Sequence, residues 1–242
     1  METTCWKIGN LLIMEPMAAI TDLLVAAISF YAYFKLRKPS AERGYLREYP
    51  LFFLFMGAGT LCAAIMTHSF YYLFSEGIYD RHQADLLPWS ERFVWHLHDL
   101  PNWLFNIISI TFFEIATIKR SSQVLKDLPV RWLYMLIAAE SAAAFVLTVI
   151  LLTYNVAGAH IFFAMIFLSL PLQIRILSRE RENAESKYIL AATFCMIVAL
   201  AVMATRCSID RWFNFTDLAH CLIAVTMYLT YMSAKKTFER YH

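Results

Sequence analysis

Long apolar runs separated by short polar segments set the pattern of this chain. Seven such runs are close to the roughly 20 residues that a helix needs to cross a hydrocarbon core about 30 Å thick. They lie at approximately 14–36, 51–74, 96–118, 132–153, 156–177, 188–205 and 213–233. Together with their connections they use nearly all of the 242 residues. The pattern therefore predicts one all-α, polytopic membrane domain over residues 1–242, with seven transmembrane helices.

Basic residues predict how this domain lies in the membrane, because Lys and Arg in short loops favour the cytoplasmic side. Most of them follow the first, third, fifth and seventh runs: Lys35, Arg37, Lys38, Arg43, Arg47, Lys119, Arg120, Lys126, Arg131, Arg175, Arg179, Arg181, Lys187, Lys235, Lys236 and Arg240. An acidic loop after the second run falls on the opposite side, with Glu76, Asp80, Asp85 and Glu91. We therefore expect the N-terminus outside and the C-terminus in the cytoplasm.

Composition agrees with this assignment and narrows the expected partners. Hydrophobic residues make up 60% of the chain and charged residues 17%, a balance typical of an integral, multi-pass membrane protein. The formal net charge is only +2 and the basic residues lie in loops, so nucleic acid is not an expected partner. Cys5 and Cys207 both fall on the predicted outer side, where a disulfide between them is one alternative and free thiols are the other.

The seventh run contains the strongest chemical signal. On a helix, Asn214, Asp217 and His220 are spaced i, i+3, i+6 and form one polar stripe. Ionisable groups are costly in hydrocarbon, so they usually face a bundle interior and often mark a functional site. Asp217 and His220 are suited to be a metal ligand with its orienting carboxylate, or two ligands. The alternative is a purely structural pair.

The predicted orientation brings further ionisable groups to the same outer leaflet. His68 lies late in the second run and is either a metal ligand or a packing histidine bonded to a neighbouring Ser or Thr. His98 and Asp99 lie at the start of the third run, where Asp99 alternatively caps the helix. Asp22 lies about two turns into the first run, where no helix cap explains it. We interpret it as a buried carboxylate that serves the site.

Four more ionisable residues in or beside the apolar runs receive simpler interpretations. Glu15 comes just before the first helix and is expected to cap it. His160 lies near an outer turn and is expected to be structural. Glu114 and Glu140 are isolated carboxylates in apolar runs, and no role is assigned to them.

The arrangement resembles a known superfamily of membrane hydrolases, which includes the alkaline ceramidases and the adiponectin receptors. Its members have seven helices with an outer N-terminus, bind zinc through one histidine of the second helix and two of the seventh, and cleave amide bonds in lipids. By this resemblance His68 and His220 match two of the zinc ligands, and Asp99 matches an aspartate of the third helix. Thr216 stands where the other histidine of the seventh helix is expected, and Ala64 replaces a serine of the second.

The resemblance implies a zinc-dependent hydrolase that acts on an amide or ester of a membrane lipid. Because one family histidine is replaced, the third ligand is expected to be Asp217, His98 or a water molecule. Asp99 or Asp22 would then accept the proton of the attacking water and return it to the leaving group.

Two alternatives come from other classes of protein. A proton- or cation-coupled transporter or sensor would use Asp22, Asp217 and His220 as a relay. A bis-histidine haem protein would use His68 together with His220 or His160 as axial ligands. Retinal is not expected, because the seventh run contains no buried lysine.

Overall fold

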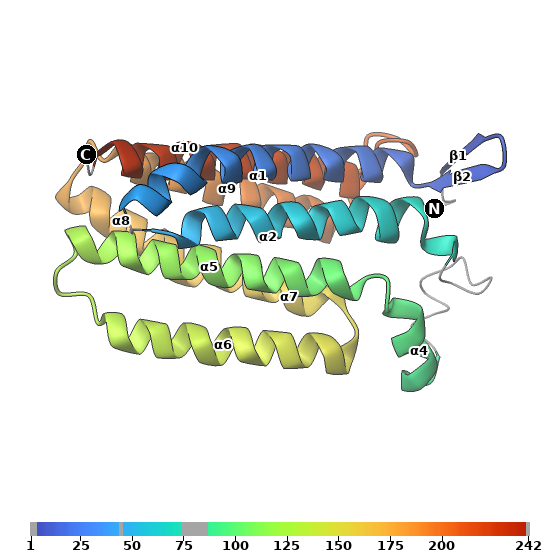
Figure 1. The fold of residues 1–242 in the computed structure, drawn as a ribbon, viewed down its shortest axis with the longest axis horizontal. Helices are drawn as coiled ribbons and strands as arrows, with labels where there is room; N and C mark the ends of the chain where they lie inside the picture. The colour runs from blue at the N-terminus through green and yellow to red at the C-terminus, as the bar shows by residue number, and fades with distance from the viewer. Residues whose placement is uncertain (1–3, 44–45, 74–86, 241–242) are drawn as a thin grey trace.

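The computed structural model of the protein describes residues 4–43, 46–73 and 87–240, which are mostly helical. Long helices run side by side along the longest axis of the molecule (Figure 1). They are α1 (Pro16–Arg43), α2 (Glu48–Cys62), α5 (Leu100–Val124), α6 (Val130–Leu151), α7 (Tyr154–Phe162), α8 (Leu170–Arg179), α9 (Ala184–Thr205) and α10 (Phe215–Arg240). The shorter elements are β1 (Cys5–Ile8), β2 (Leu11–Met14), η1 (Ala63–Ser69), η2 (Tyr71–Leu73), α4 (Trp89–His96) and η3 (Phe163–Ser169).

Each predicted apolar run overlaps one or more of these helices, so the mainly helical fold is confirmed. Helix α2 continues into the π-helical η1, and α7 continues through the π-helical η3 into α8. Within the described residues, five helices are long and apolar enough to cross a membrane: Pro16–Glu42, Glu48–Ser69, Val130–Leu151, Tyr154–Arg179 and Ala184–Thr205. Helices α5 and α10 are of similar length, but they contain more polar residues and do not meet the same criterion.

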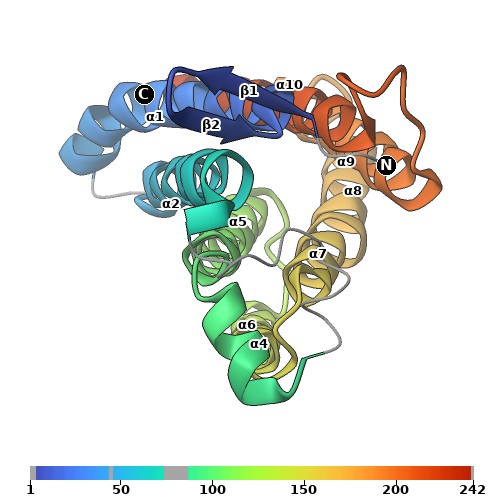
Figure 2. The same cartoon turned by 90° about the vertical axis from the view of Figure 1, so that its right-hand side faces the viewer.

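The long helices close into a ring when the molecule is viewed along their axes (Figure 2). Each contacts the next in chain order: α1 with α2, α2 with α5, α5 with α6, and α6 with α7. The return side runs through η3 and α8 to α9 and then α10. Because α10 also packs against α1, the first and last helices are neighbours. Three separate helices can therefore meet at one point, although their sequences are far apart.

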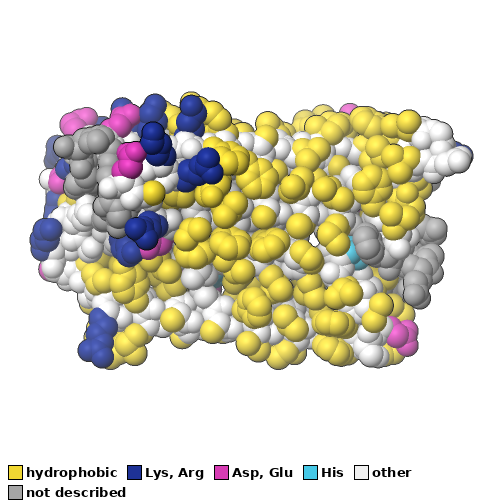
Figure 3. Space-filling view, in the orientation of Figure 1, with side chains coloured by type: hydrophobic (Ala, Val, Ile, Leu, Met, Phe, Trp, Pro, Cys, Tyr) yellow, Lys and Arg dark blue, Asp and Glu magenta, His cyan; other side chains and the backbone are white. Residues whose placement is uncertain are grey.

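Apolar and charged side chains occupy different parts of the molecular surface. Figure 3 shows an apolar band over the middle of the molecule, with Lys and Arg gathered at the end where α1, α5, α8 and α10 finish. Large apolar side chains point outward on several helices, including Trp132, Phe167 and Phe194. Such an exposed apolar surface is typical of helices that contact lipid. Glu76, Asp80 and Asp85 of the predicted acidic loop lie outside the described residues.

Local sequence explains where several helices begin and end. The side chain of Asn183 accepts a hydrogen bond from the Ser186 backbone N–H and so caps α9. Helix α9 ends at Thr205, and the capping residue Arg206 has a left-handed φ of 51°, as is common at helix C-termini. In α2, a Cβ atom on Gly59 would lie 3.2 Å from the Phe105 Cβ, so glycine permits the close approach of α5.

A buried guanidinium joins three helices near the basic end. Arg120 donates to the Gln173 and Asn183 side-chain oxygens at 2.6 and 2.8 Å and to the Ser186 hydroxyl at 2.8 Å. Close by, Asn183 donates to Glu180 at 2.8 Å, and Arg240 pairs with the same carboxylate at 2.9 Å. The Asn183 hydrogen bond and the Arg240 guanidinium hold the pKa of Glu180 below its usual value. Arg120, Asn183, Glu180 and Arg240 thus belong to one network of polar contacts.

A β-hairpin precedes α1, where the apolar pattern predicts only a short N-terminal segment. Strands β1 and β2 pair antiparallel, with Cys5 opposite Met14, and Gly9 turns the chain with a φ of 60°. Helix α1 consequently begins at Pro16, two residues later than predicted. Cys5 and Cys207 are both exposed and are free thiols, so the alternative disulfide is not formed in this structure.

Candidate metal centre

Three side chains with metal-binding chemistry meet between the first, second and last long helices. They are Asp22 on α1, His68 on η1 and His220 on α10, and one ligand atom of each lies within 4.8 Å of the others. Asp22 and His68 are buried, at 2% and 6% exposure, and His220 is partly buried. The packing of α1 against both α2 and α10 is what brings residues nearly 200 positions apart into one cluster.

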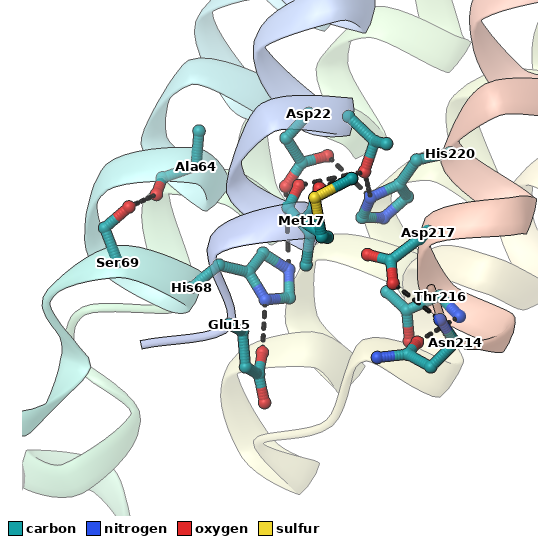
Figure 4. Close-up of polar contacts among 12 residues, drawn as sticks. Glu15, Met17, Asp22, Ala64, His68, Ser69, Asn214, Thr216, Asp217 and His220 are labelled. Carbon is teal, nitrogen blue, oxygen red and sulfur yellow. Dashed lines mark hydrogen bonds and ion pairs between the residues drawn. The ribbon is translucent and has the colours of Figure 1, made fainter. Parts of the chain in front are cut away.

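Glu15 orients His68. The Nδ1 atom of His68 lies 2.6 Å from Glu15 Oε2, and Nε2 lies 3.5 Å from Asp22 Oδ2 (Figure 4). A carboxylate beside Nδ1 favours the proton on that nitrogen, which leaves the Nε2 lone pair directed toward Asp22. This is the arrangement in which a carboxylate fixes the orientation of a metal-binding histidine.

The π-helical turn of η1 sets the position of His68. The Phe70 N–H donates to the Ile65 carbonyl at 3.0 Å, five residues earlier, and the Ser69 hydroxyl donates to the Ala64 carbonyl at 2.6 Å. A widened turn of this kind rotates the following side chains relative to a regular α-helix, and such turns occur frequently at functional sites. Ala64 therefore supports the turn through its backbone carbonyl.

Asp22 contacts both imidazole rings, which also pack edge-on against each other. Its Oδ1 is 3.3 Å from His220 Nδ1, which is also 3.2 Å from the Thr21 hydroxyl. The Thr21 hydroxyl already donates to backbone carbonyls of the preceding turn at 3.0 Å, so its oxygen accepts from His220. Nδ1 of His220 thus bears a proton in this arrangement. Asp22 Oδ2 is buried and receives no hydrogen bond from the described residues.

Asp217 has a structural partner at the start of α10. Its Oδ2 accepts from the Asn214 N–H at 2.7 Å, while the Asn214 side chain accepts from the Thr216 N–H at 2.7 Å. These reciprocal bonds form a capping box, which explains the spacing of Asn214 and Asp217. The other Asp217 oxygen, Oδ1, is buried without a hydrogen-bond partner among the described residues, and Figure 4 shows the carboxyl group beside His220. Asp217 is not part of the group formed by Asp22, His68 and His220.

His98 and Asp99 belong to a separate polar cluster at the start of α5. Asp99 lies 3.0 Å from His96 Nδ1 and 3.6 Å from His98 Nε2, and all three residues are buried. The Trp95 ring packs edge-on against both histidines. Neither His98 nor Asp99 is in the group formed by Asp22, His68 and His220. Their roles as metal ligand and proton acceptor stay predictions.

Comparison with known proteins places the chain in a family. Residues 17–238 match the sequence profile of DUF6962, a family of unknown function. The chain belongs to the DUF6962 family. No curated protein matches it, and no solved structure does. In this DUF6962 protein the matched range contains the group of three, whereas Glu15 and the hairpin precede it.

The chemistry of this DUF6962 site depends on two acceptor atoms, one on a histidine and one on a carboxylate, whose lone pairs face each other. His68 Nε2 and Asp22 Oδ2 are both acceptors when Glu15 holds the proton on Nδ1, so a positive charge between them, either a cation or a proton, would stabilise the pair. Two imidazoles and a carboxylate are suited to Zn²⁺. Cation binding through His220 Nδ1 would release the proton on that atom. Because His68 Nε2 and His220 Nδ1 both face Asp22, the geometry gives no supporting observation for haem.

Sequence reasoning places His68, His220 and Asp22 in one region of this DUF6962 protein, but it misses Glu15. We interpreted Glu15 as a helix cap, whereas the structure turns its carboxylate toward His68. The chain reaches this position through the hairpin and through a left-handed Glu15 backbone with a φ of 41°. The Gly9-Asn10 dipeptide between two apolar segments was the signal for the hairpin.

Proposed function

We propose that this protein crosses the membrane seven times with its N-terminus outside, and that it is a zinc-dependent hydrolase of a lipid amide or ester. One observation carries the proposal: Asp22 Oδ2, buried and without a hydrogen bond from the described residues, faces His68 Nε2 at 3.5 Å. The resemblance to seven-helix hydrolases supports the same chemistry at this place. The apolar outer surface supports a substrate that approaches from the lipid.

Each side chain of the site has a separate role in this proposal. Asp22, His68 and His220 would hold the ion, and Glu15 keeps Nε2 of His68 directed at it. When bound, Zn²⁺ supplies an activated water molecule near neutral pH and polarises a carbonyl group. Hydrolysis adds the water oxygen to the carbonyl carbon, breaks the C–N or C–O bond, and transfers a proton to the leaving nitrogen or oxygen. Asp217 is the group that we assign to carry this proton, through its Oδ1 atom.

Metal analysis and hydrolysis test this proposal on the full-length protein in lipid nanodiscs. Wild type is expected to bind zinc and to hydrolyse fluorogenic long-chain amides or esters, with loss of activity on chelation and recovery on adding Zn²⁺. His220→Ala should lose one equivalent of metal and the activity, while the exposed control Glu182→Gln keeps both. Full metal retention by His220→Ala, or hydrolysis that persists through chelation, would overturn it.

The orientation has its own test. Cys207, exposed after α9, and Cys5 in the hairpin should react with a membrane-impermeant maleimide added to intact cells. A Cys5→Ser, Cys207→Ser double variant should lose that labelling. Labelling that appears only after the membrane is permeabilised would reverse the assignment.

A second candidate, a proton relay in a transporter or sensor, is favoured by one specific observation. Glu15, His68, Asp22 and His220 form a continuous series of contacts at 2.6, 3.5 and 3.3 Å. Proton movement along such a series requires no metal. Proteoliposomes that conduct protons or take up a solute in response to a pH gradient, and that continue to do so in chelator, would favour this candidate over the hydrolase.

A further inference from the structure

A second group of ligand-type side chains lies on the other side of the helix ring. Glu114 on α5, Glu140 on α6 and His160 on α7 each offer one ligand atom, and these atoms lie within 4.8 Å of one another. None of these helices contributes to the group formed by Asp22, His68 and His220. The two groups are therefore built independently, each from three different helices.

Both ring nitrogens of His160 face acceptor oxygens. Its Nε2 lies 3.2 Å from the Ile107 carbonyl oxygen, which can only accept, so Nε2 donates in this contact. The other nitrogen, Nδ1, lies 2.7 and 2.6 Å from the two oxygens of Glu140. The Ile107 carbonyl fixes the orientation of the ring, and an ion bound through Nδ1 would release the proton that the carboxylate holds there.

Glu114 adds a third ligand-type side chain to the pair formed by His160 and Glu140. Its side chain is fully buried, and neither of its oxygens has a hydrogen-bond partner among the described residues. Burial of a carboxylate without a partner is costly, and inside a membrane bundle water does not replace the missing donor. One of these oxygens lies within 4.8 Å of the ligand atoms of Glu140 and His160. The group thus contains an acceptor that needs a positive partner.

Charge and ligand type identify the partner. Once a bound ion has displaced the proton on His160 Nδ1, two ionised carboxylates and a neutral imidazole carry a formal charge of −2, which one divalent cation neutralises. Imidazole favours first-row transition ions over Mg²⁺ and Ca²⁺, whose ligands are oxygen atoms. We propose that Glu114, Glu140 and His160 form a second divalent transition-metal site, which binds Zn²⁺ and accepts Co²⁺ as its probe.

The place of this site suggests what it does for the fold. Helix α6 buries less of its surface than the other four apolar helices. In lipid, apolar contacts give little preference for helix over lipid, so polar contacts and close packing hold helices together. An ion shared by α5, α6 and α7 would fasten α6 to the ring. The π-helical segment η3, which begins three residues after His160, resembles the π-helical turn beside His68.

The experiment removes the first site and measures the second. His220→Ala protein in nanodiscs is stripped with chelator and titrated with Co²⁺, and visible absorbance is followed together with thermal unfolding. We expect one equivalent to bind, with a higher unfolding temperature. Adding Glu114→Gln, which keeps the shape of the side chain, should weaken Co²⁺ binding at least 10-fold. Adding the exposed Glu182→Gln instead should change nothing.

Each outcome decides the question separately from the proposed function. If His220→Ala binds no Co²⁺, or if the Glu114→Gln double variant binds it as tightly, the second site is refuted whether or not the first site hydrolyses lipids. If Glu114→Gln does not fold, the His220→Ala titration alone decides, because it requires only that one equivalent binds and stabilises. A site at α1, η1 and α10 that fails to bind metal leaves this test unchanged.

Discussion

Glu15 has a left-handed backbone, and its carboxylate contacts His68. The substitution Glu15→Gly changes both properties, with opposite effects on stability. A φ of 41° costs a non-glycine residue about 1 kcal/mol, which glycine relieves. The same change removes a 2.6 Å hydrogen bond from a buried histidine, and a bond to a charged group is worth about 1.5–3 kcal/mol. The lost bond outweighs the relief, so the free energy of unfolding should fall by about 0.5–2 kcal/mol.

Arg206→Gly is the matched control. Arg206 has a left-handed φ of 51° at the end of α9 and an exposed side chain. This substitution should relieve the same strain without removing a contact to His68, and should raise the free energy of unfolding by up to about 1 kcal/mol. The difference between the two variants then measures the contact between Glu15 and His68.

The assay combines denaturant unfolding in detergent with competition for Zn²⁺ against a chromophoric chelator. Loss of an orienting carboxylate typically weakens metal binding about 10- to 100-fold, so Glu15→Gly should show that loss at the His220-dependent site and Arg206→Gly should not. Equal stability changes in the two variants would show that the carboxylate does not hold His68. Equal metal affinity would show that Glu15 does not position the ligand.

Three further predictions concern stability. Gly59→Val should lower the free energy of unfolding by about 1–3 kcal/mol through crowding against α5, whereas Gly158→Ala, which meets no atom within 4 Å, should raise it by about 0.5–1 kcal/mol; denaturant titration in detergent compares them. Arg120→Met should cost about 3 kcal/mol or more, because the polar partners of the buried guanidinium lose their donor, and unchanged unfolding would contradict this. The lowered pKa of Glu180 gives stability that is complete above its usual value of 4.5 and is lost as the pH falls through the lower folded value; Glu180→Gln should flatten that acid decline in a thermal unfolding series.

The helices could be predicted because their signal is local. A run of about 20 apolar residues indicates a helix in an apolar environment without reference to the rest of the chain, and each predicted run overlaps a helix in the structure. The convergence of Asp22, His68 and His220 was predictable in part, because an ionisable side chain in an apolar run needs a polar partner. The sequence gives no distance between them. That depends on α1 packing between α2 and α10.

The features of the site that could not be predicted depend on contacts between segments that lie far apart in the chain. Asp217 looks like a ligand by its spacing to His220, but the same spacing to Asn214 makes a capping box, and the backbone bonds take one oxygen. Along the chain, Glu114 and Glu140 are isolated carboxylates in apolar runs. They lie close to His160 because α5, α6 and α7 are neighbours, and because each of these helices carries its ligand-type side chain on the face that packs against the other two.

The contact between α1 and α10 also bears on how the protein is made. Asp22 and His68 enter the membrane with the first two long helices, but His220 arrives only when α10 has been synthesised. Until then Asp22 can contact His68 but not His220. The group of Asp22, His68 and His220 is therefore complete only after the last long helix has been made and has packed against α1.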